Sequence, residues 1–97
     1  MIEHVVLFKW IEGTSETQIA EVIEALKELK EKIPGIVDLS CGTNFSDRAQ
    51  GYQTGLVVRF SDRSALEAYQ PHADHQAVVQ DKIKPIVKEI FSVDYMI

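Results

Sequence analysis

Two short segments of this sequence are apolar on both of their faces, and no other feature limits the possible folds as strongly. The segments Val5–Trp10 and Thr54–Phe60 are rich in β-branched and aromatic residues, which predicts a strand for each. In the first segment, one face carries Val6 and Phe8 and the other carries Val5 and Leu7. In the second segment, one face carries Leu56, Val58 and Phe60 and the other carries Gly55 and Val57. A sheet with helices on one side needs only one apolar face. Something else is therefore expected to cover the second face.

The remaining sequence predicts further helices and strands. Ser15 and Gln18 have the spacing of a capping box, and apolar residues then recur at helical spacing as far as Ile33, just before a Pro-Gly pair. The other predicted elements are a strand over residues 36–44, a polar loop over 45–51, a short helix over 63–69, a helix over 74–90 and a strand over 91–97. Because Pro85 lacks an N–H group, the last helix is expected to kink or break near Lys84.

The predicted elements follow the order β-α-β-β-α-β, which is the ferredoxin-like arrangement of an α+β domain. This order gives a four-stranded antiparallel sheet with helices on one face and the two apolar strands in its centre. At 97 residues the chain is expected to form one domain, residues 1–97. The helices cannot cover both faces, so a second copy of the sheet is the simplest cover. We therefore expect a homodimer through the sheet face, with an apolar-surfaced monomer as the alternative.

Charge and composition argue against several kinds of partner. A net charge of −5 and a pI near 5.1 disfavour nucleic acid, because phosphate binding needs a dense Lys/Arg surface. No apolar stretch reaches the roughly 20 residues of a membrane-spanning helix, and the N-terminus lacks the pattern of a signal peptide. The single cysteine, Cys41, excludes an intrachain disulfide, and with three dispersed histidines it makes no zinc pattern. We expect a cytoplasmic protein with no membrane contact, metal or cofactor.

Six short motifs along the chain carry a family resemblance. They are HVVLFK at residues 4–9, GY at 51–52, LVVRF at 56–60, LEAY at 66–69, HADH at 72–75 and VDY at 93–95. In this order and spacing the chain resembles the stress-responsive dimeric A/B barrel (Dabb) family over essentially its whole length. The resemblance implies a ferredoxin-like protomer and a dimeric α/β barrel, in which two sheets form a barrel-like core. It implies no single activity, because fold does not carry function across such a family.

At least one plant member of that family is a polyketide cyclase that works without metal or organic cofactor, and the resemblance carries two of its residues to this chain. They are Tyr69, at the end of the short helix, and His75, six residues further on. A neutral imidazole can take a proton from carbon next to a carbonyl, and a phenol can donate a hydrogen bond to the enolate oxygen. His4 lies on the same strand face as Val6 and Phe8, so it is expected to converge with the pair.

Three residues are further candidates for ligand binding. Val6, Phe8 and His72 would contact a small apolar or aromatic carbonyl compound between the sheet and the helices. The cyclase has another histidine on its third strand, where this chain has Thr54. The site is therefore expected to differ from that of the cyclase.

Each candidate also has a purely structural interpretation. Asp74 is a good N-cap residue, and His75 would then only pack or hydrogen-bond at the start of a helix. Tyr69 would be a core ring with its hydroxyl bonded to the backbone, and His4 a strand histidine with satisfied hydrogen bonds. Cys41 has no cationic activator nearby in the sequence, so it is expected to be a small buried hydrophobe.

Three functions are compatible with this sequence. The first is a small stress-responsive dimeric A/B barrel protein without an assigned reaction. The second is a cofactor-independent enzyme of the polyketide cyclase or aldol-type lyase class, with Tyr69 as hydrogen-bond donor and His75 as base. The third is a haem- or quinone-type monooxygenase of the related dimeric ferredoxin-like groups. An apolar cavity beside His75 would favour the second function, whereas a fully packed region would remove its physical basis.

Overall fold

Four antiparallel strands form one sheet in the order β2-β3-β1-β4, in a computed structural model that describes residues 1–97. The strands are β1 (Ile2–Trp10), β2 (Ile36–Thr43), β3 (Thr54–Phe60) and β4 (Val87–Met96). The helices are α1 (Glu16–Lys32), α2 (Arg63–Tyr69), α3 (Ala73–Val78) and the π-helical turn η1 (Val79–Ile83). The predicted ferredoxin-like arrangement is confirmed, with the two apolar strands β1 and β3 in the centre of the sheet.

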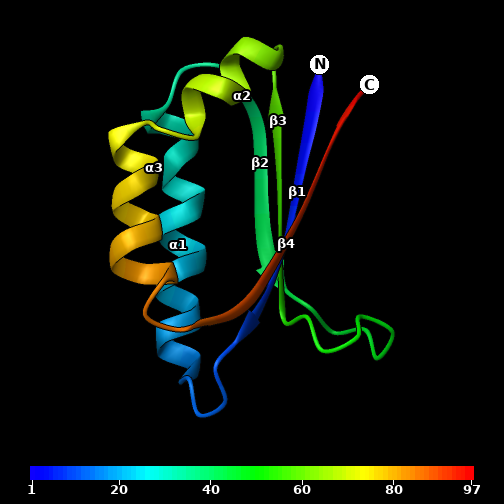
Figure 1. Cartoon of the computed structure of the whole chain (residues 1–97), viewed down its shortest axis with the longest axis vertical. Coiled ribbons are helices and arrows are strands. Elements are labelled where there is room, and N and C mark those ends of the chain that lie inside the picture. The colour runs from blue at the N-terminus through cyan, green and yellow to red at the C-terminus, as the bar shows by residue number, and fades with distance from the viewer.

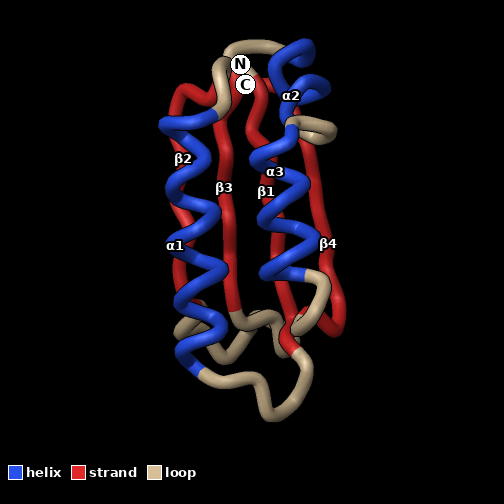
Figure 2. The backbone as a smooth tube through the Cα atoms, turned by 90° about the vertical axis from the view of Figure 1, so that its left-hand side faces the viewer, coloured by secondary structure: helices blue, strands red, loops and turns tan.

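All helices lie on one side of the sheet (Figure 1). In Figure 2, α1 runs in front of β2 and α3 in front of β1, whereas β4 lies at the edge of the sheet. Helix α1 begins at the predicted capping box, where the Ser15 hydroxyl accepts from Gln18 N at 3.1 Å and the Gln18 side chain accepts from Ser15 N at 3.0 Å. None of the helices combines the length and hydropathy that crossing a bilayer demands.

The last helix is shorter than the sequence predicts, and β4 is longer. The helical pattern extends to Ile90, but α3 and η1 end at Ile83. Pro85 has no N–H group to continue the helix, and the chain turns there, with Ile86 N donating to Ile83 O at 3.0 Å. Strand β4 therefore starts at Val87 instead of residue 91 and pairs with β1 from there onwards. The apolar residues after the proline belong to a strand, although their spacing resembles a helical stripe.

The inner face of the sheet packs against α1 and forms the core. Its buried side chains include Val22, Leu26 and Leu29 of α1, and Val6, Phe8, Leu56, Val58 and Phe60 of the sheet. Trp10 closes one end of this core, where its indole N–H donates to Thr54 Oγ1 at 2.9 Å. The Trp10 ring also stacks on Phe8, with ring centroids 5.1 Å apart. Trp10 and Phe8 therefore fill the core between β1 and β3 at that end.

The outer face of the sheet has no helix over it and carries a continuous apolar stripe. This outer stripe consists of Val5, Leu7, Val57, Phe91 and Val93. Phe91 is 53% exposed and Val93 is 46% exposed. The second apolar face expected from the sequence is therefore present. No helix covers it, and the Tyr52 ring reaches one end of it, with its centroid 6.2 Å from that of Phe91.

Candidate active site

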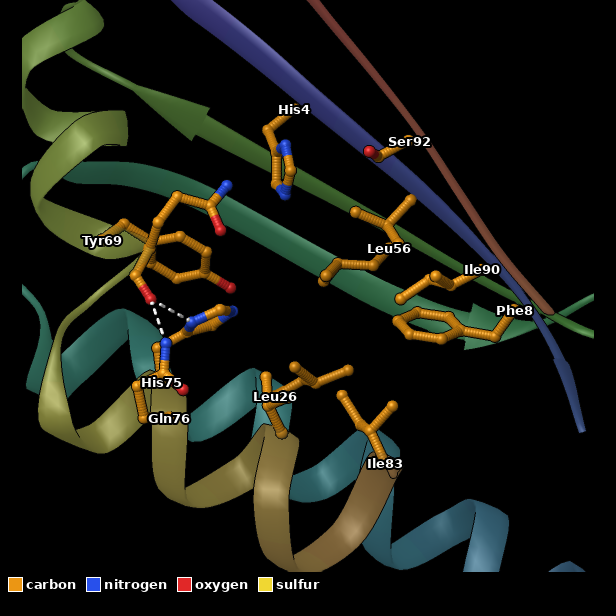
Figure 3. A pocket seen from close by; sticks show the side chains of 13 residues that line it. His4, Phe8, Leu26, Leu56, Tyr69, His75, Gln76, Ile83, Ile90 and Ser92 are labelled. Carbon is orange, nitrogen blue, oxygen red and sulfur yellow. Dashed lines mark hydrogen bonds between the residues drawn. The ribbon is translucent and has the colours of Figure 1, made fainter. Parts of the chain in front are cut away.

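A cavity of about 300 Å³ lies between the inner face of the sheet and the helices (Figure 3). Its polar wall residues are His4, Tyr69, Gln70, His75, Gln76 and Ser92, and its apolar wall residues are Val6, Phe8, Leu26, Leu56, Val79, Ile83 and Ile90. In Figure 3, His4, Tyr69 and His75 lie towards one end of the cavity, and Phe8 and Ile83 lie towards the other. The aliphatic side chains of α1 do not fill this space. The cavity therefore has a polar end and an apolar end.

Tyr69, His75 and His4 meet at the polar end of the cavity. Tyr69 is the last residue of α2, His75 is in the first turn of α3, and His4 is in β1. The ring centroids of Tyr69 and His75 are 4.2 Å apart, and those of His4 and Tyr69 are 6.0 Å apart. Three titratable side chains from three elements therefore surround one space that a small molecule can enter.

The Tyr69 hydroxyl has no hydrogen-bond partner, although its side chain is completely buried. The backbone does not hold this hydroxyl, contrary to the structural interpretation of the sequence. Its oxygen points into the cavity (Figure 3). Burial, and to a lesser extent the nearby Cys41, raises the pKa of Tyr69 above its ordinary value of 10.0. At neutral pH the group is a phenol whose O–H is free to donate to a ligand.

The preceding turn determines which nitrogen of His75 is free. Nδ1 lies 2.9 Å from Gln70 O, and a carbonyl oxygen can only accept, so Nδ1 carries the proton. The Gln76 amide donates to the same oxygen at 2.9 Å. Burial lowers the pKa of His75, against the effect of the Gln70 hydrogen bond, and His4 and His72 lower it further. The ring is therefore neutral near pH 7, with a free lone pair on Nε2.

His4 is held by a residue that the sequence analysis did not single out. Its Nδ1 hydrogen-bonds to Asp94 Oδ1, and the two residues are direct partners in the β1–β4 register. Because an ionised carboxylate only accepts, Nδ1 carries the proton and Nε2 is left free. Asp94 lies in the VDY motif, but only the strand register shows that it faces His4. Ser92, two residues earlier on the same face, could have been found from the alternation of the predicted strand.

Two residues considered in the sequence analysis do not line the cavity. His72 is the N-cap of α3, and its Nδ1 accepts a hydrogen bond from Asp74 N at 3.1 Å. The expected cap, Asp74, is therefore inside the helix instead of at its start. Thr54 is 1% exposed and accepts the hydrogen bond of Trp10, so it belongs to the core.

The single cysteine is a protonated thiol in the core. Burial raises the pKa of Cys41 to about 11, against smaller opposite effects of Lys27 and the Gly42 backbone. A thiol with this pKa is a poor nucleophile at neutral pH.

No three His, Cys, Asp or Glu side chains come together as metal ligands. The acid–base groups on the cavity wall are therefore its two histidines and Tyr69.

Comparison with known sequences gives one family. The family model of the stress responsive A/B barrel domain (Dabb) matches residues 2–97. Among curated proteins, the chain is similar to a stress-response A/B barrel domain-containing protein of Arabidopsis thaliana, with 29% identity over 92 residues. The match covers 94% of this chain and 35% of the relative, so the chain spans about a third of the relative's length.

Comparison with solved structures gives the same fold. A dimeric ferredoxin-like protein of unknown function from Thermobifida fusca has a TM-score of 0.87 and 28% identity, covering 99% of this chain and 90% of that chain. The hydroxynitrile lyase from Passiflora edulis has a TM-score of 0.88 and 19% identity, covering 99% of this chain and 92% of that chain. At 19% identity, the likeness to the lyase establishes the fold alone.

Proposed function

The chain belongs to the stress responsive A/B barrel domain family, and from this premise we propose that it is a cofactor-independent acid–base enzyme for small carbonyl compounds. The observation that carries the proposal is the Tyr69 hydroxyl, which is buried and unpaired beside His75. A buried polar group without a partner costs about 1–3 kcal/mol, so its presence calls for an explanation. We assign to this hydroxyl a hydrogen bond with a bound ligand.

The proposed reaction begins at a carbon next to a carbonyl group. His75 Nε2 takes a proton from this carbon, and the C–H electron pair forms an enolate whose oxygen accepts a hydrogen bond from Tyr69. The enolate carbon then attacks a second carbonyl, which forms a C–C bond and an alkoxide, as in a cyclisation or aldol-type condensation. The reverse sequence cleaves that bond, and the hydroxynitrile lyase from Passiflora edulis is by its name a lyase on this fold. A general base typically contributes about 10²–10⁴-fold, and one oxyanion donor about 10²–10³-fold.

The cavity indicates the size and polarity of the substrate. Its volume of about 300 Å³ is at the lower limit of ligand sites, which span about 300–1,000 Å³. A compact molecule is therefore expected, with its carbonyl groups at the end formed by His4, Tyr69 and His75. Its apolar or aromatic part would lie against Phe8 and Ile83, at the other end. Small β-diketones and aryl ketones have this shape.

Hydrogen exchange at carbon tests the proposal. Incubated with the protein in D₂O, a panel of small β-diketones and aryl ketones should contain compounds whose α-protons exchange faster than in buffer, as measured by ¹H NMR. Tyr69→Phe and His75→Asn should each lower the protein-dependent rate by about tenfold or more. The matched control is His72→Asn, a histidine outside the cavity replaced by a residue that still caps α3. The proposal is wrong if no compound is accelerated, or if the acceleration survives both cavity substitutions.

We also propose that a second copy of the chain covers the outer stripe and gives a homodimer with its sheets face to face. Ion pairs border this stripe at both ends, with Arg59 Nε 2.6 Å from Glu3 and Lys9 Nζ 3.2 Å from Glu89. An apolar centre with a charged rim is typical of protein interfaces. The similar protein from Thermobifida fusca is described as dimeric, which supports the same assembly here.

Light scattering at micromolar concentration tests the dimer. The expected mass is twice the 11.0 kDa of the chain. Val93→Lys places a charge within the outer stripe and should give a monomer, whereas Glu24→Lys on the exposed face of α1 should not change the mass. A monomeric wild-type protein, or a Val93→Lys variant that stays dimeric, contradicts the proposed interface.

A cytoplasmic location is the third part of the proposal. Cys41 is free and buried, and a reducing compartment keeps such thiols reduced. Fractionation of cells that express the full chain tests this location. Recovery of the protein outside the cytoplasmic fraction contradicts it.

A further inference from the structure

A second hollow of about 320 Å³ lies next to Asp94. It is lined by Ile2, Arg63, Leu66, Asp94, Tyr95 and Met96, none of which lines the cavity described above. His4, in contrast, lines the cavity and not this hollow. The hydrogen bond between His4 Nδ1 and Asp94 Oδ1 is therefore a polar contact that connects two separate spaces.

The two partners of this hydrogen bond differ in their contact with solvent. The His4 side chain is only 7% exposed, and the Asp94 side chain is 42% exposed. The aromatic rings of Phe60 and Tyr69 flank His4, with centroids 6.2 Å and 6.0 Å from its own. A substrate in the cavity would cover the part of His4 that is still open, but Asp94 would stay in contact with water in the hollow.

We propose that His4 and Asp94 form a proton relay between the cavity and the solvent in the second hollow, an inference that rests on the proposed acid–base function. In the starting state His4 Nδ1 carries a proton and Asp94 is ionised. When a hydroxyl group in the cavity gives up a proton, Nε2 accepts it, Nδ1 passes its own proton to Asp94, and the carboxylic acid releases it to water. In the reverse sequence Nε2 gives this proton to an alkoxide, and Asp94 takes a proton from water and passes it to Nδ1, which restores the starting state.

The proposed reaction has a use for such a relay. In the direction that cleaves the C–C bond, a hydroxyl group of the substrate has to lose a proton while the substrate still fills the cavity. In the proposed reaction His75 Nε2 serves the carbon, and its Nδ1 is already bonded to the Gln70 carbonyl, which cannot accept a proton at neutral pH. Nδ1 of His4 is bonded instead to the ionisable carboxylate of Asp94. His4 is therefore the cavity histidine that can exchange protons with bulk water through its own hydrogen bond.

Few charged or titratable groups surround the relay. They are Tyr69 and His75 on the side of the cavity, and Arg63 and Tyr95 on the side of the hollow. Arg63 is the one cation that lines the hollow, and no ion pair joins it to Asp94. Glu3, the chain neighbour of His4, is paired with Arg59. The Asp94 carboxylate is therefore free to take up the proton of His4 and release it to water.

Proton exchange at His4 tests the relay without any substrate. In protein labelled with ¹⁵N-histidine, NMR measures how fast the Nδ1 proton of His4 exchanges with water. Asp94→Asn keeps an acceptor oxygen for this N–H but cannot take up its proton, so the exchange should slow by about tenfold or more while Nδ1 stays protonated. Leu66→Phe, which narrows the second hollow, should also slow the exchange. Ser92→Val, which changes only the cavity wall, should not.

The outcomes separate two routes for water. The relay is wrong if Asp94→Asn leaves the exchange rate unchanged, or if Ser92→Val slows the exchange and Leu66→Phe does not, since water then reaches His4 through the cavity. Should Asp94→Asn fail to give a dispersed spectrum, the comparison of Leu66→Phe with Ser92→Val decides alone. The relay and the proposed function also fail separately. If proton exchange at His4 depends on Asp94 but the protein accelerates no hydrogen exchange in ketones, the proposed function is wrong and the relay stands.

Discussion

The ring of Tyr69 lies 4.2 Å from the ring of His75, centroid to centroid, and the hydroxyl buried beside that contact has no protein partner. One oxygen atom therefore weakens the folded chain and also provides the cavity with a hydrogen-bond donor. Burial of the His75 ring also has two consequences. It lowers the pKa, so the ring is a neutral base near pH 7, and it makes protonation of the ring at lower pH unfavourable for the folded chain. Stability and function are thus expected to respond in opposite directions at these residues.

Replacing Tyr69 with Phe should leave the free energy of unfolding unchanged or raise it by up to about 1 kcal/mol. The substitution removes an unpaired hydroxyl and keeps the ring that fills the core. Urea unfolding of the two proteins measures the difference. If the variant instead loses more than about 1 kcal/mol, the hydroxyl has a stabilising partner and the argument for a ligand-binding role fails.

The protein should become less stable as the pH falls below the ordinary histidine pKa of 6.5. Because burial lowers the pKa of His75 in the folded chain, the unfolded chain takes up its proton at a higher pH. Between pH 6.5 and the lower folded pKa the unfolded state holds more protons, so the free energy of unfolding decreases with falling pH. His75→Asn should remove this part of the dependence in a series of urea unfolding curves. An identical pH dependence in both proteins would assign the effect to other groups.

Gly35→Ala should destabilise the fold clearly. Gly35 has a φ of +93°, and a Cβ atom there would lie 2.6 Å from Cβ of Ala65. The strained backbone alone costs about 1–3 kcal/mol, and the clash adds to it. Gly42→Ala is the matched control, because a Cβ at Gly42 meets no atom within 4 Å and its φ is not positive. Thermal unfolding should show a large loss for the first variant and none for the second, and equal losses would contradict this explanation.

Thr54→His should destabilise the protein without adding a third histidine to the cavity wall. Thr54 is 1% exposed and accepts the indole N–H of Trp10, so a larger side chain overfills the core and removes that hydrogen bond. Overpacking costs about 1–3 kcal/mol, and an unpaired indole N–H adds to this cost. Thr54→Ser keeps the acceptor oxygen and serves as the control. Thermal unfolding followed by tryptophan fluorescence checks both variants, and an equally stable Thr54→His protein would show that this position has spare room.

The elements of the fold were predictable where one local rule was sufficient. The capping box at Ser15 and the two-faced strands β1 and β3 appear as expected. The end of the last helix was predicted too late, because Ile86, Val87 and Ile90 fit a helical stripe and a strand equally well. Only the pairing of β4 with β1 shows which of the two structures these residues adopt.

The candidate site was predictable in its residues and not in its contacts. The family resemblance implies Tyr69 and His75, strand alternation adds His4, and all three line the cavity. Asp94 was missed because strand register cannot be inferred from one strand alone. His72 was included because it precedes the helix in the HADH motif, but its side chain is used to cap that helix.

The sequence by itself determined the order of the elements, the two apolar faces of the central strands and the break at Pro85. These features follow from alternation, capping and backbone sterics, which act over a few neighbouring residues. Only the tertiary structure decided that the Tyr69 hydroxyl stays unpaired, that His4 meets Asp94, and that a cavity remains between them and the helices. Those outcomes depend on the register of β1 against β4 and on how closely the helices approach the sheet. Both are set by packing among side chains that lie far apart in the chain.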